Sequence, residues 1–488
     1  MKINPFTLLA SLVVAIFLTG CTGVLPPAPF GATPSERQLE WHKMKYYAFI
    51  HFSPNTFTDK EWGFGDEPES IFDPTGLDCR QWARVAKEAG MEGIIITAKH
   101  HDGFCLWPSA FTEHSVKNSP WREGEGDLLK ELREACNEYG LKMGIYLSPW
   151  DRNHAAYGTD EYITYYRDQL TELMTQYGEI FEVWFDGANG GDGYYGGANE
   201  TRRIDNKTYY DWENTIRIVR EHQPMAVMFS DGGPDIRWIG NERGYAAETN
   251  WCTIRGGLFY PGIGGVNKQL EEGHEDGDIW LPAEVNTSIR PGWFYHPNED
   301  ERVKSVEQLV DNWYHSVGMN GNFLLNLPVD RRGLVHENDI KALQSLKEYI
   351  DKAFSADYSV KAKTSASNIR GNSNTFDASN VIDDDPESCW ATDDDVRDAS
   401  IVISLQEPTK MNAILLQEYI RLGQRAKSFR IEAFQEGNYK EIAAGTTIGN
   451  RRIVRFPVIE TTGLRISIKG KAALLISNIE IYLTPGLQ

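Results

Sequence analysis

One carboxylate directly follows a buried-looking apolar run in the segment that spans residues 181–190. Short runs of β-branched and aromatic residues are typical of buried strands, and the glycines after the run are typical of a loop. Asp186 is therefore expected at the C-terminal tip of a strand. In a (β/α) barrel, catalytic side chains gather at that edge.

Three further strand tips carry polar side chains. His51 ends the first expected strand, with Glu61 and Trp62 on the loop after it, and residues 99–102, which include His100 and His101, end the second. Tyr146 lies in the third. Tips of one barrel converge over its mouth, so these groups are expected to share a pocket.

Each residue also has a structural interpretation. His51 can be a hydrogen-bonded histidine at a strand end, and the pair His100–His101 can form a turn. Trp62, Trp107 and Trp293 can be core aromatics. Asp186 can cap the next helix, but the glycine-rich loop after it disfavours an immediate helix start.

A metal site is the competing chemistry, because His51, His100, His101 and Asp102 are all ligand types. Spacing disfavours it: adjacent strand residues point to opposite faces, and no His-x-His, His-Glu-x-x-His or paired-cysteine motif is present. We therefore expect no metal and no cofactor. Imidazoles, carboxylates and aromatic faces suit a sugar, whose hydroxyls they bind and whose apolar side they cover.

Retaining hydrolysis of a sugar needs a second carboxylate, a proton donor roughly 5–5.5 Å from the nucleophile. Candidates follow the fifth expected strand, and composition leaves all of them open: Asp231, Asp235, Glu242 and Glu248. A glutamate has the longer reach for a movable acid, and a nearby aromatic such as Trp238 can raise its pKa by limiting hydration.

Alternating strand-like and helical patterns between residues 45 and 355 are typical of βα units. Seven strands are expected, at residues 47–51, 93–98, 143–147, 181–185, 225–229, 279–282 and 322–325, with helices at 80–89 and 127–139 among others. One strand can be missed, so we predict a distorted (β/α)8-type barrel over residues 38–355, with an open parallel sheet as the alternative. Short alternating runs after residue 356 predict an all-β sandwich to residue 488.

The N-terminal residues are typical of an export signal. An apolar stretch from Leu8 to Leu18 is followed by a small-residue site and Cys21, which resembles a bacterial lipobox. Residues 1–21 are interpreted as a signal, with lipidation of Cys21 favoured over plain secretion, and residues 22–37 as a linker. The expected location is periplasmic or at the cell surface, with membrane contact only through the lipid.

The net charge limits the classes of binding partner, and the cysteine spacing limits the kinds of cross-link and metal site. The formal net charge of −21 argues against nucleic acid or an anionic membrane surface. The other five cysteines have no close paired spacing, which indicates neither a disulfide scaffold nor a zinc cluster.

The motifs together resemble glycoside hydrolase family 29, the α-L-fucosidases. The matching segments are residues 47–52, 61–63, 98–104, 144–146 and 183–187, in the family's order and spacing across the barrel region. The resemblance implies a retaining, metal-independent α-L-fucosidase with Asp186 as nucleophile. It also implies the residues that hold the hydroxyls and ring of the fucose: His51, Glu61, Trp62, His100, His101 and Tyr146. Trp293 is expected near the sugar. One departure is Ser53, where many members carry glycine.

The acid and the linkage follow from a subfamily resemblance. Residues 233–242 resemble the subfamily that prefers α-1,3 and α-1,4 fucosyl linkages on branched glycans, which implies Glu242 over Glu248 as acid. The expected substrate is a fucosylated oligosaccharide or glycoconjugate cleaved at its terminal fucose. Broad or α-1,2 preference, a non-catalytic glycan-binding lipoprotein, a transglycosylase and a metal-dependent hydrolase are the alternatives. The C-terminal domain resembles discoidin-like modules, in which residues 383–385 form either a calcium site or a solvated acidic turn.

Overall fold

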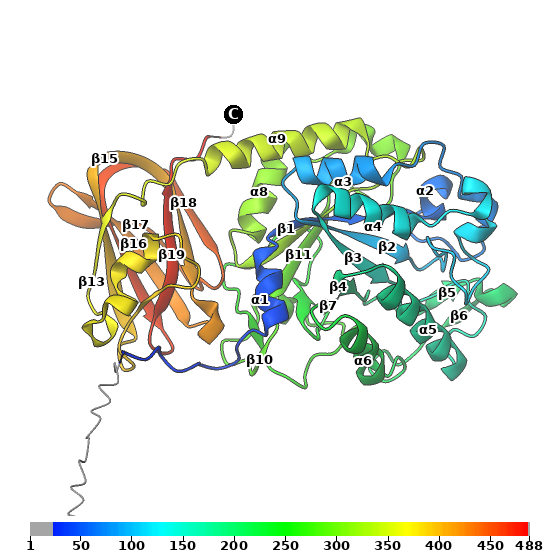
Figure 1. The fold of residues 1–488 in the computed structure, drawn as a ribbon, viewed down its shortest axis with the longest axis horizontal. Helices are drawn as coiled ribbons and strands as arrows, with labels where there is room; N and C mark the ends of the chain where they lie inside the picture. Colours follow the sequence, from blue (N-terminus) through cyan, green and yellow to red (C-terminus); the bar gives the residue numbers. More distant parts are fainter. Residues whose placement is uncertain (1–22, 487–488) are drawn as a thin grey trace, which may run out of the picture.

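The computed structural model describes residues 23–486 and shows two joined domains (Figure 1). The signal segment and Cys21 lie outside the described residues. Eight parallel strands close into a barrel in the order β1-β12-β11-β8-β7-β4-β3-β2. They are β1 (Tyr46–Ile50), β2 (Gly93–Lys99), β3 (Lys142–Leu147), β4 (Ile180–Trp184), β7 (Val227–Ser230), β8 (Ile236–Trp238), β11 (Ala283–Ser288) and β12 (Gly321–Asn326). The barrel is confirmed and the open sheet is wrong.

Two strand predictions near the middle of the chain need correction. The run at 279–282 is not a barrel strand: β10 (Ile279–Trp280) pairs antiparallel with β9 (Thr253–Ile254) outside the barrel. The barrel strand there is β11, and the unseen eighth strand is the three-residue β8. β11 was not predicted because polar residues such as Glu284 and Asn286 alternate along it. β8 was not predicted because it is short and follows a Gly-Pro-Asp turn too closely to show a strand-like hydrophobic pattern.

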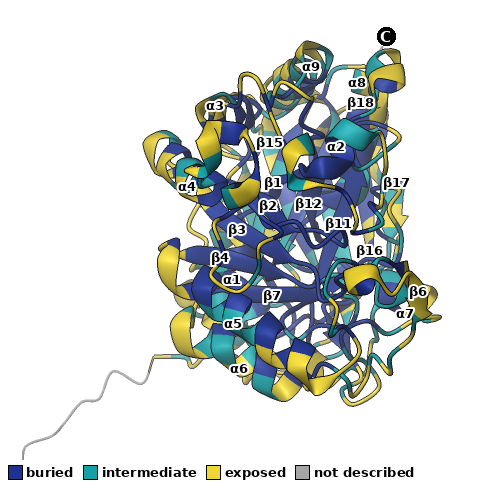
Figure 2. Cartoon of the chain, turned by 90° about the vertical axis from the view of Figure 1, so that its right-hand side faces the viewer, coloured by how far each residue is buried: buried dark blue, intermediate teal, exposed yellow. Residues whose placement is uncertain are grey.

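Helices surround the strands and turn exposed faces outward (Figure 2). The predicted helices are α3 (Cys79–Glu88) and α4 (Leu128–Tyr139); Asp127 caps α4 by accepting from the amide of Lys130, and Gly140 ends it with φ +65°. The other outer helices are α5 (Asp160–Gln176), α6 (Trp212–His222), α8 (Val306–Ser316) and α9 (Glu337–Ala353). Shorter elements are α1 (Glu36–Lys43), α2 (Pro54–Thr58), α7 (Asn267–Glu272), β5 (Gly191–Gly193) and β6 (Glu200–Arg202).

The C-terminal domain is antiparallel throughout, as predicted. Its strands are β13 (Lys363–Ala366), β14 (Trp390–Ala391), β15 (Asp398–Glu418), β16 (Ala426–Gln435), β17 (Asn438–Gly445), β18 (Arg452–Gly470) and β19 (Leu475–Tyr482). It contacts segments that precede barrel strands: the amide of Asn320 donates to the carbonyl of Arg451, and Met319 bridges to Arg452. The sandwich therefore lies against the N-terminal ends of the strands, away from the mouth.

The segment interpreted as a linker lies along this domain (Figure 1). The amide of Phe30 donates to the carbonyl of Leu422, and Arg425 and Arg370 donate to the carbonyls of Ala28 and Leu25. The five described cysteines are buried and free. Within residues 23–486, no helix is long and apolar enough to cross a membrane.

Candidate active site

Asp186 lies just beyond β4 with a carboxylate held on both oxygens. Tyr146 Oη donates to Oδ2 at 3.1 Å, and the amide of Ala188 donates to Oδ1 at 2.7 Å. Burial raises the pKa of Asp186, and these two hydrogen bonds oppose that rise. The side chain keeps 24% of its surface exposed, so the carboxylate is oriented and accessible.

Two neutral histidines belong to the same site, and Nε2 of His101 lies 3.9 Å from Oδ2 of Asp186. His51 Nδ1 lies 2.8 Å from Asn326 Oδ1, and His101 Nδ1 lies 2.7 Å from Ser148 Oγ. Asn326 donates its amide elsewhere and Ser148 donates to the carbonyl of Trp150, so both partners accept from Nδ1–H. Burial lowers the pKa of each histidine to about 3. Each ring therefore offers Nε2 as an acceptor suited to a sugar hydroxyl.

His100 completes the histidine cluster. Its ring stacks on Tyr146 at 5.7 Å and lies 4.2 Å from the ring of His101. The backbone turns after Lys99, where β2 ends, so the expectation that these neighbours point to opposite faces fails here. His100 Nδ1 is buried without a partner among the described residues, which leaves a donor or acceptor for a ligand.

Trp62 is exposed, and Trp293 is partly buried at the edge of a core cluster. Trp62 is 53% exposed and meets His101 edge-on at 5.2 Å, while the Trp293 ring lies 5.3 Å from that of His51. Trp107, by contrast, is 1% exposed and donates to Glu172 in the core. The two accessible indoles flank the histidine cluster, where an aromatic face can cover a sugar ring.

Glu61 fixes the loop that carries Trp293. Its carboxylate accepts from the amides of Trp293 at 2.9 Å and Phe294 at 3.2 Å, and it lies 2.7 Å from His296 Nε2. A carboxylate has about four lone-pair sites, so Glu61 can still accept a sugar hydroxyl. The contacts seen in the structure show Glu61 holding the loop that carries Trp293.

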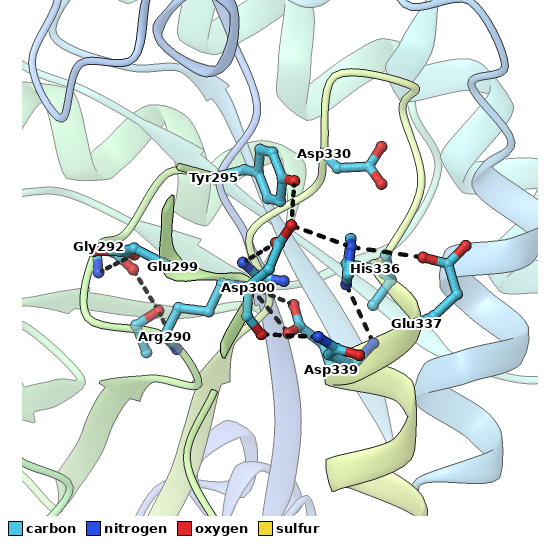
Figure 3. A network of polar contacts seen from close by, with 12 residues as sticks. Arg290, Gly292, Tyr295, Glu299, Asp300, Asp330, His336, Glu337 and Asp339 are labelled. Atoms are coloured by element: carbon cyan, nitrogen blue, oxygen red, sulfur yellow. Dashed lines mark hydrogen bonds and ion pairs between the residues drawn. The ribbon is translucent and has the colours of Figure 1, made fainter. Parts of the chain in front are cut away.

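A polar network anchors the other end of that loop (Figure 3). Arg290 donates to both oxygens of Asp339 at 3.0 Å and to Asp300 at 2.8 Å. Tyr295 donates to Asp300 at 3.2 Å. The Arg290 side chain is fully buried, and its partners are carboxylates from the loop and from α9. Nε–H is shared between the two oxygens of Asp339 while Nη1 bonds Asp300, so two carboxylates hold the guanidinium in one orientation.

Glu242 reaches the cluster from the loop after β8. Trp293 Nε1 donates to Glu242 Oε2 at 3.3 Å. Burial of the carboxyl, together with the nearby Asp186 and Glu61 carboxylates, raises the pKa of Glu242, while the Trp293 bond opposes the rise. A carboxyl inclined to hold its proton beside an oriented carboxylate is the pairing that acid catalysis of glycoside cleavage requires.

Two of the other candidate acids are engaged elsewhere. Asp235 is buried, with Arg220 bonding both its oxygens at 2.5 Å. Glu248 accepts from Arg452 of the sandwich at 2.5 Å. Asp231 remains: the pairing of Trp184 with Phe229 places Asp231 beside Asp186 on the neighbouring strand tip. Burial, then Asp186 and Glu242, raise the pKa of Asp231 to about 7.

Several supporting residues had no contact or role assigned to them from the sequence. Asn326 joins the site's parts by lying against His51 and donating to the carbonyl of Trp293. Lys99 is fully buried and donates to Asp151 at 3.0 Å, which fixes the turn before His100. Ser53, the departure from the family pattern, caps α2 and donates to Asp102 at 2.6 Å. The motif residues next to Lys99 could have drawn attention to it, whereas no sequence pattern points to Asn326.

The described part of the chain contains no group of three or more His, Cys, Asp or Glu side chains arranged to hold a metal. At residues 383–385, Asp383 accepts from Ser388 and Asp385 accepts from the amide of Glu387, the contacts of a local acidic turn.

A closed (β/α)8 barrel with two carboxylates, neutral imidazoles and two accessible indoles at its mouth defines a sugar-processing enzyme. A family model described as alpha-L-fucosidase matches residues 29–353, and one described as F5/8 type C domain matches residues 361–479. The chain belongs to the α-L-fucosidase family, glycoside hydrolase family 29, and is an enzyme of that class.

Known α-L-fucosidases resemble this chain in sequence over nearly its whole length. Alpha-L-fucosidase 1 of Arabidopsis thaliana is 41% identical over 94% of this chain and 88% of its own. A putative alpha-L-fucosidase structure from Bacteroides thetaiotaomicron is 40% identical with a TM-score of 0.86, covering 94% and 99% of the two chains. A Ruminococcus gnavus GH29 fucosidase solved in complex with fucose is 30% identical with a TM-score of 0.86, covering 96% and 98%.

Proposed function

We propose that this α-L-fucosidase is exo-acting and retaining. The Asp186 carboxylate attacks the anomeric carbon of a terminal fucose, and the Glu242 carboxyl protonates the leaving oxygen. The bond to the aglycone breaks as the bond to Asp186 forms. Glu242, now ionised, then takes a proton from water, which attacks the fucosyl-enzyme and frees Asp186.

The observation that carries this assignment is the contrast between the two carboxyl groups. Asp186 is held by two donors, Tyr146 and Ala188, which favour its ionised form. Among residues 23–486, Glu242 accepts only the long Trp293 contact, and two neighbouring carboxylates disfavour its ionisation. Nucleophile and acid need these opposite protonation states.

The remaining residues are assigned to substrate binding. His51, His100 and His101 accept or donate to the fucose hydroxyls, and Tyr146 orients Asp186 below the ring. Trp62 and Trp293 cover the apolar faces of the bound sugar. Glu61 bonds a hydroxyl while it holds the Trp293 loop.

Product analysis tests the reaction. Asp186→Ala should remove turnover of an aryl fucoside by orders of magnitude, with the folded state unchanged by circular dichroism. NMR of the first-formed wild-type product should show the α-anomer of fucose. Full activity in Asp186→Ala would end the nucleophile assignment, and a β-anomer formed first would end the retaining one.

For linkage, we infer a preference for α-1,3- and α-1,4-linked fucose on branched glycans. The support is the sequence around Gly240, Asn241 and Glu242, which resembles the subfamily with that preference. Parallel digestion of Lewis-type trisaccharides and an α-1,2-fucosylated sugar tests it. Equal cleavage would indicate broad specificity, and faster α-1,2 cleavage would reverse the preference.

We also propose export and lipid anchoring at Cys21, on the basis of the apolar stretch and small-residue site before it. Metabolic labelling with a palmitate analogue should mark the wild-type chain and not Cys21→Ser. Equal labelling of both would exclude Cys21 as the lipid site.

A further inference from the structure

Two fully buried carboxyl groups lie inside the barrel and take no part in the proposed reaction. Glu182 on β4 and Glu284 on β11 are both 0% exposed. Two ionised carboxylates in such a place would repel one another without water to screen them. The pair is therefore stable when it shares one proton, which makes one member an acid and the other a carboxylate.

Hydrogen-bond donors decide which member carries the charge. Tyr47 Oη donates to Glu284 Oε2 at 2.5 Å, and Trp184 Nε1 donates to Oε1 at 2.8 Å. Glu182 receives only Trp41 Nε1, at 3.1 Å, and its Oε1 has no donor among the described residues. Burial and the neighbouring Glu284 raise the pKa of Glu182 well above its usual range. Glu182 thus holds the proton and Glu284 the charge.

A chain of direct contacts links the charged member to Asp186. Glu284 fixes the indole N–H of Trp184, whose ring stacks on Tyr146 at 5.4 Å and 25°. Tyr146 Oη in turn donates to Asp186 Oδ2 at 3.1 Å. Trp184 is clamped on its other face by Phe229, stacked at 3.9 Å, so its orientation sets that of Tyr146.

We propose that Glu284 is a positioning residue for catalysis: its carboxylate fixes Trp184, on which the Tyr146 ring that orients Asp186 rests. The proposal rests on the assignment of Asp186 as nucleophile. It gives the pair an asymmetric design in which Glu284 must be an acceptor and Glu182 must be a donor.

The pH profile reports on this chain because Asp186 must be ionised to attack. The titratable groups that face Asp186 are Tyr146 from β3, His101 after β2, Asp231 after β7 and Glu242 after β8. Only Tyr146 is reached through Trp184. Weakening its hydrogen bond removes an influence that lowers the pKa of Asp186, so the acid limb of activity moves to higher pH.

The experiment compares two isosteric variants of the pair. In Glu284→Gln the acceptor is neutral. If its NH2 faces Tyr47, the phenol must turn round to accept and the Trp184 bond loses its charge assistance; if the NH2 faces Trp184, the indole bond is lost. We expect kcat to fall about tenfold, KM to change little, and the acid limb to move upward. Glu182→Gln retains a donor toward Glu284, and its acid limb should stay where the wild type has it.

A second variant covers the case in which Glu284→Gln does not fold. Trp184→Phe keeps an aromatic ring against Tyr146 but removes the N–H that Glu284 fixes, and it should also move the acid limb upward. Either variant with lower activity but an unmoved limb would show a merely structural role and overturn the proposal. Equal limb shifts in Glu182→Gln and Glu284→Gln would overturn the asymmetric pair.

Asp186→Ala is measured alongside so that the two assignments can fail separately. Retained turnover in Asp186→Ala contradicts the nucleophile assignment on which the proposal depends. Lost turnover there, with an unmoved limb in Glu284→Gln and Trp184→Phe, contradicts the positioning role alone.

Discussion

Tyr146 and Asp186 link two neighbouring strand tips of the site, with Oη of the phenol donating to Oδ2 of the carboxylate at 3.1 Å. The phenol favours the ionised carboxylate, and burial raises the pKa of Tyr146 itself well above its usual range, so it keeps its proton. The pair is therefore a protonated donor and an ionised acceptor when Asp186 attacks the sugar.

Tyr146→Phe should move the acid limb of kcat/KM to higher pH, because Asp186 loses a bond that stabilises its charge. Hydrogen bonds to charged groups contribute about 1.5–3 kcal/mol, so kcat/KM should fall roughly tenfold to a hundredfold. A pH–rate profile on an aryl fucoside measures both. An unmoved limb would show that Tyr146 does not tune Asp186.

Glu242→Gln should cost far more on a fucosylated oligosaccharide than on a nitrophenyl fucoside, because a good leaving group needs little protonation. Glu248→Gln is the matched control: that carboxylate bonds Arg452 on the sandwich and should leave the ratio of the two rates unchanged. If the control changes the ratio and Glu242→Gln does not, the acid has been assigned to the wrong glutamate.

Trp293→Phe should move the alkaline limb upward. The acid must be protonated, so activity falls as pH rises through the pKa of Glu242, and the Trp293 N–H lowers that pKa by bonding the carboxylate. Removing the donor lets Glu242 keep its proton to higher pH. A limb that moves downward or stays in place would contradict this contact.

Asp231→Asn should stabilise the protein at alkaline pH. The pKa of Asp231 is raised from its ordinary 3.8 to about 7 in the folded chain, so between these two values native Asp231 holds a proton that the unfolded chain has lost. The wild type therefore loses stability between about pH 4 and 7, by no more than about 4 kcal/mol. Denaturant unfolding at pH 8 should favour Asp231→Asn, and the gain should vanish near pH 4.

Strand tips with strongly apolar runs were predictable from the sequence, and so was the cluster around Asp186. Residues 93–98 and 181–185 gave clear strands because both faces are buried, which leaves a continuous apolar run. β11 was missed because Glu284, Asn286 and Ser288 point into the barrel, where hydrogen bonds replace apolar packing. A polar interior has no periodic hydrophobic signal.

The ambiguity among the acids had a different origin. Asp235 and Glu248 are chemically able to donate a proton, and only their partners Arg220 and Arg452 remove them from contention. Those partners lie 15 and 204 residues away in sequence, beyond any local pattern. The double role of Glu61, which holds the Trp293 loop across 232 residues, was hidden for the same reason.

The apolar contact between the barrel and the sandwich has a practical consequence for engineering. Leu39, Cys252 and Trp280 of the barrel side pack with Ile420 of the sandwich in one apolar cluster, and Tyr482 joins the main barrel core. A chain cut after Ala353 would expose this surface and a thiol to solvent. Exchanging the C-terminal module for another would therefore require a redesigned seam, and heating should melt the two domains in a single transition.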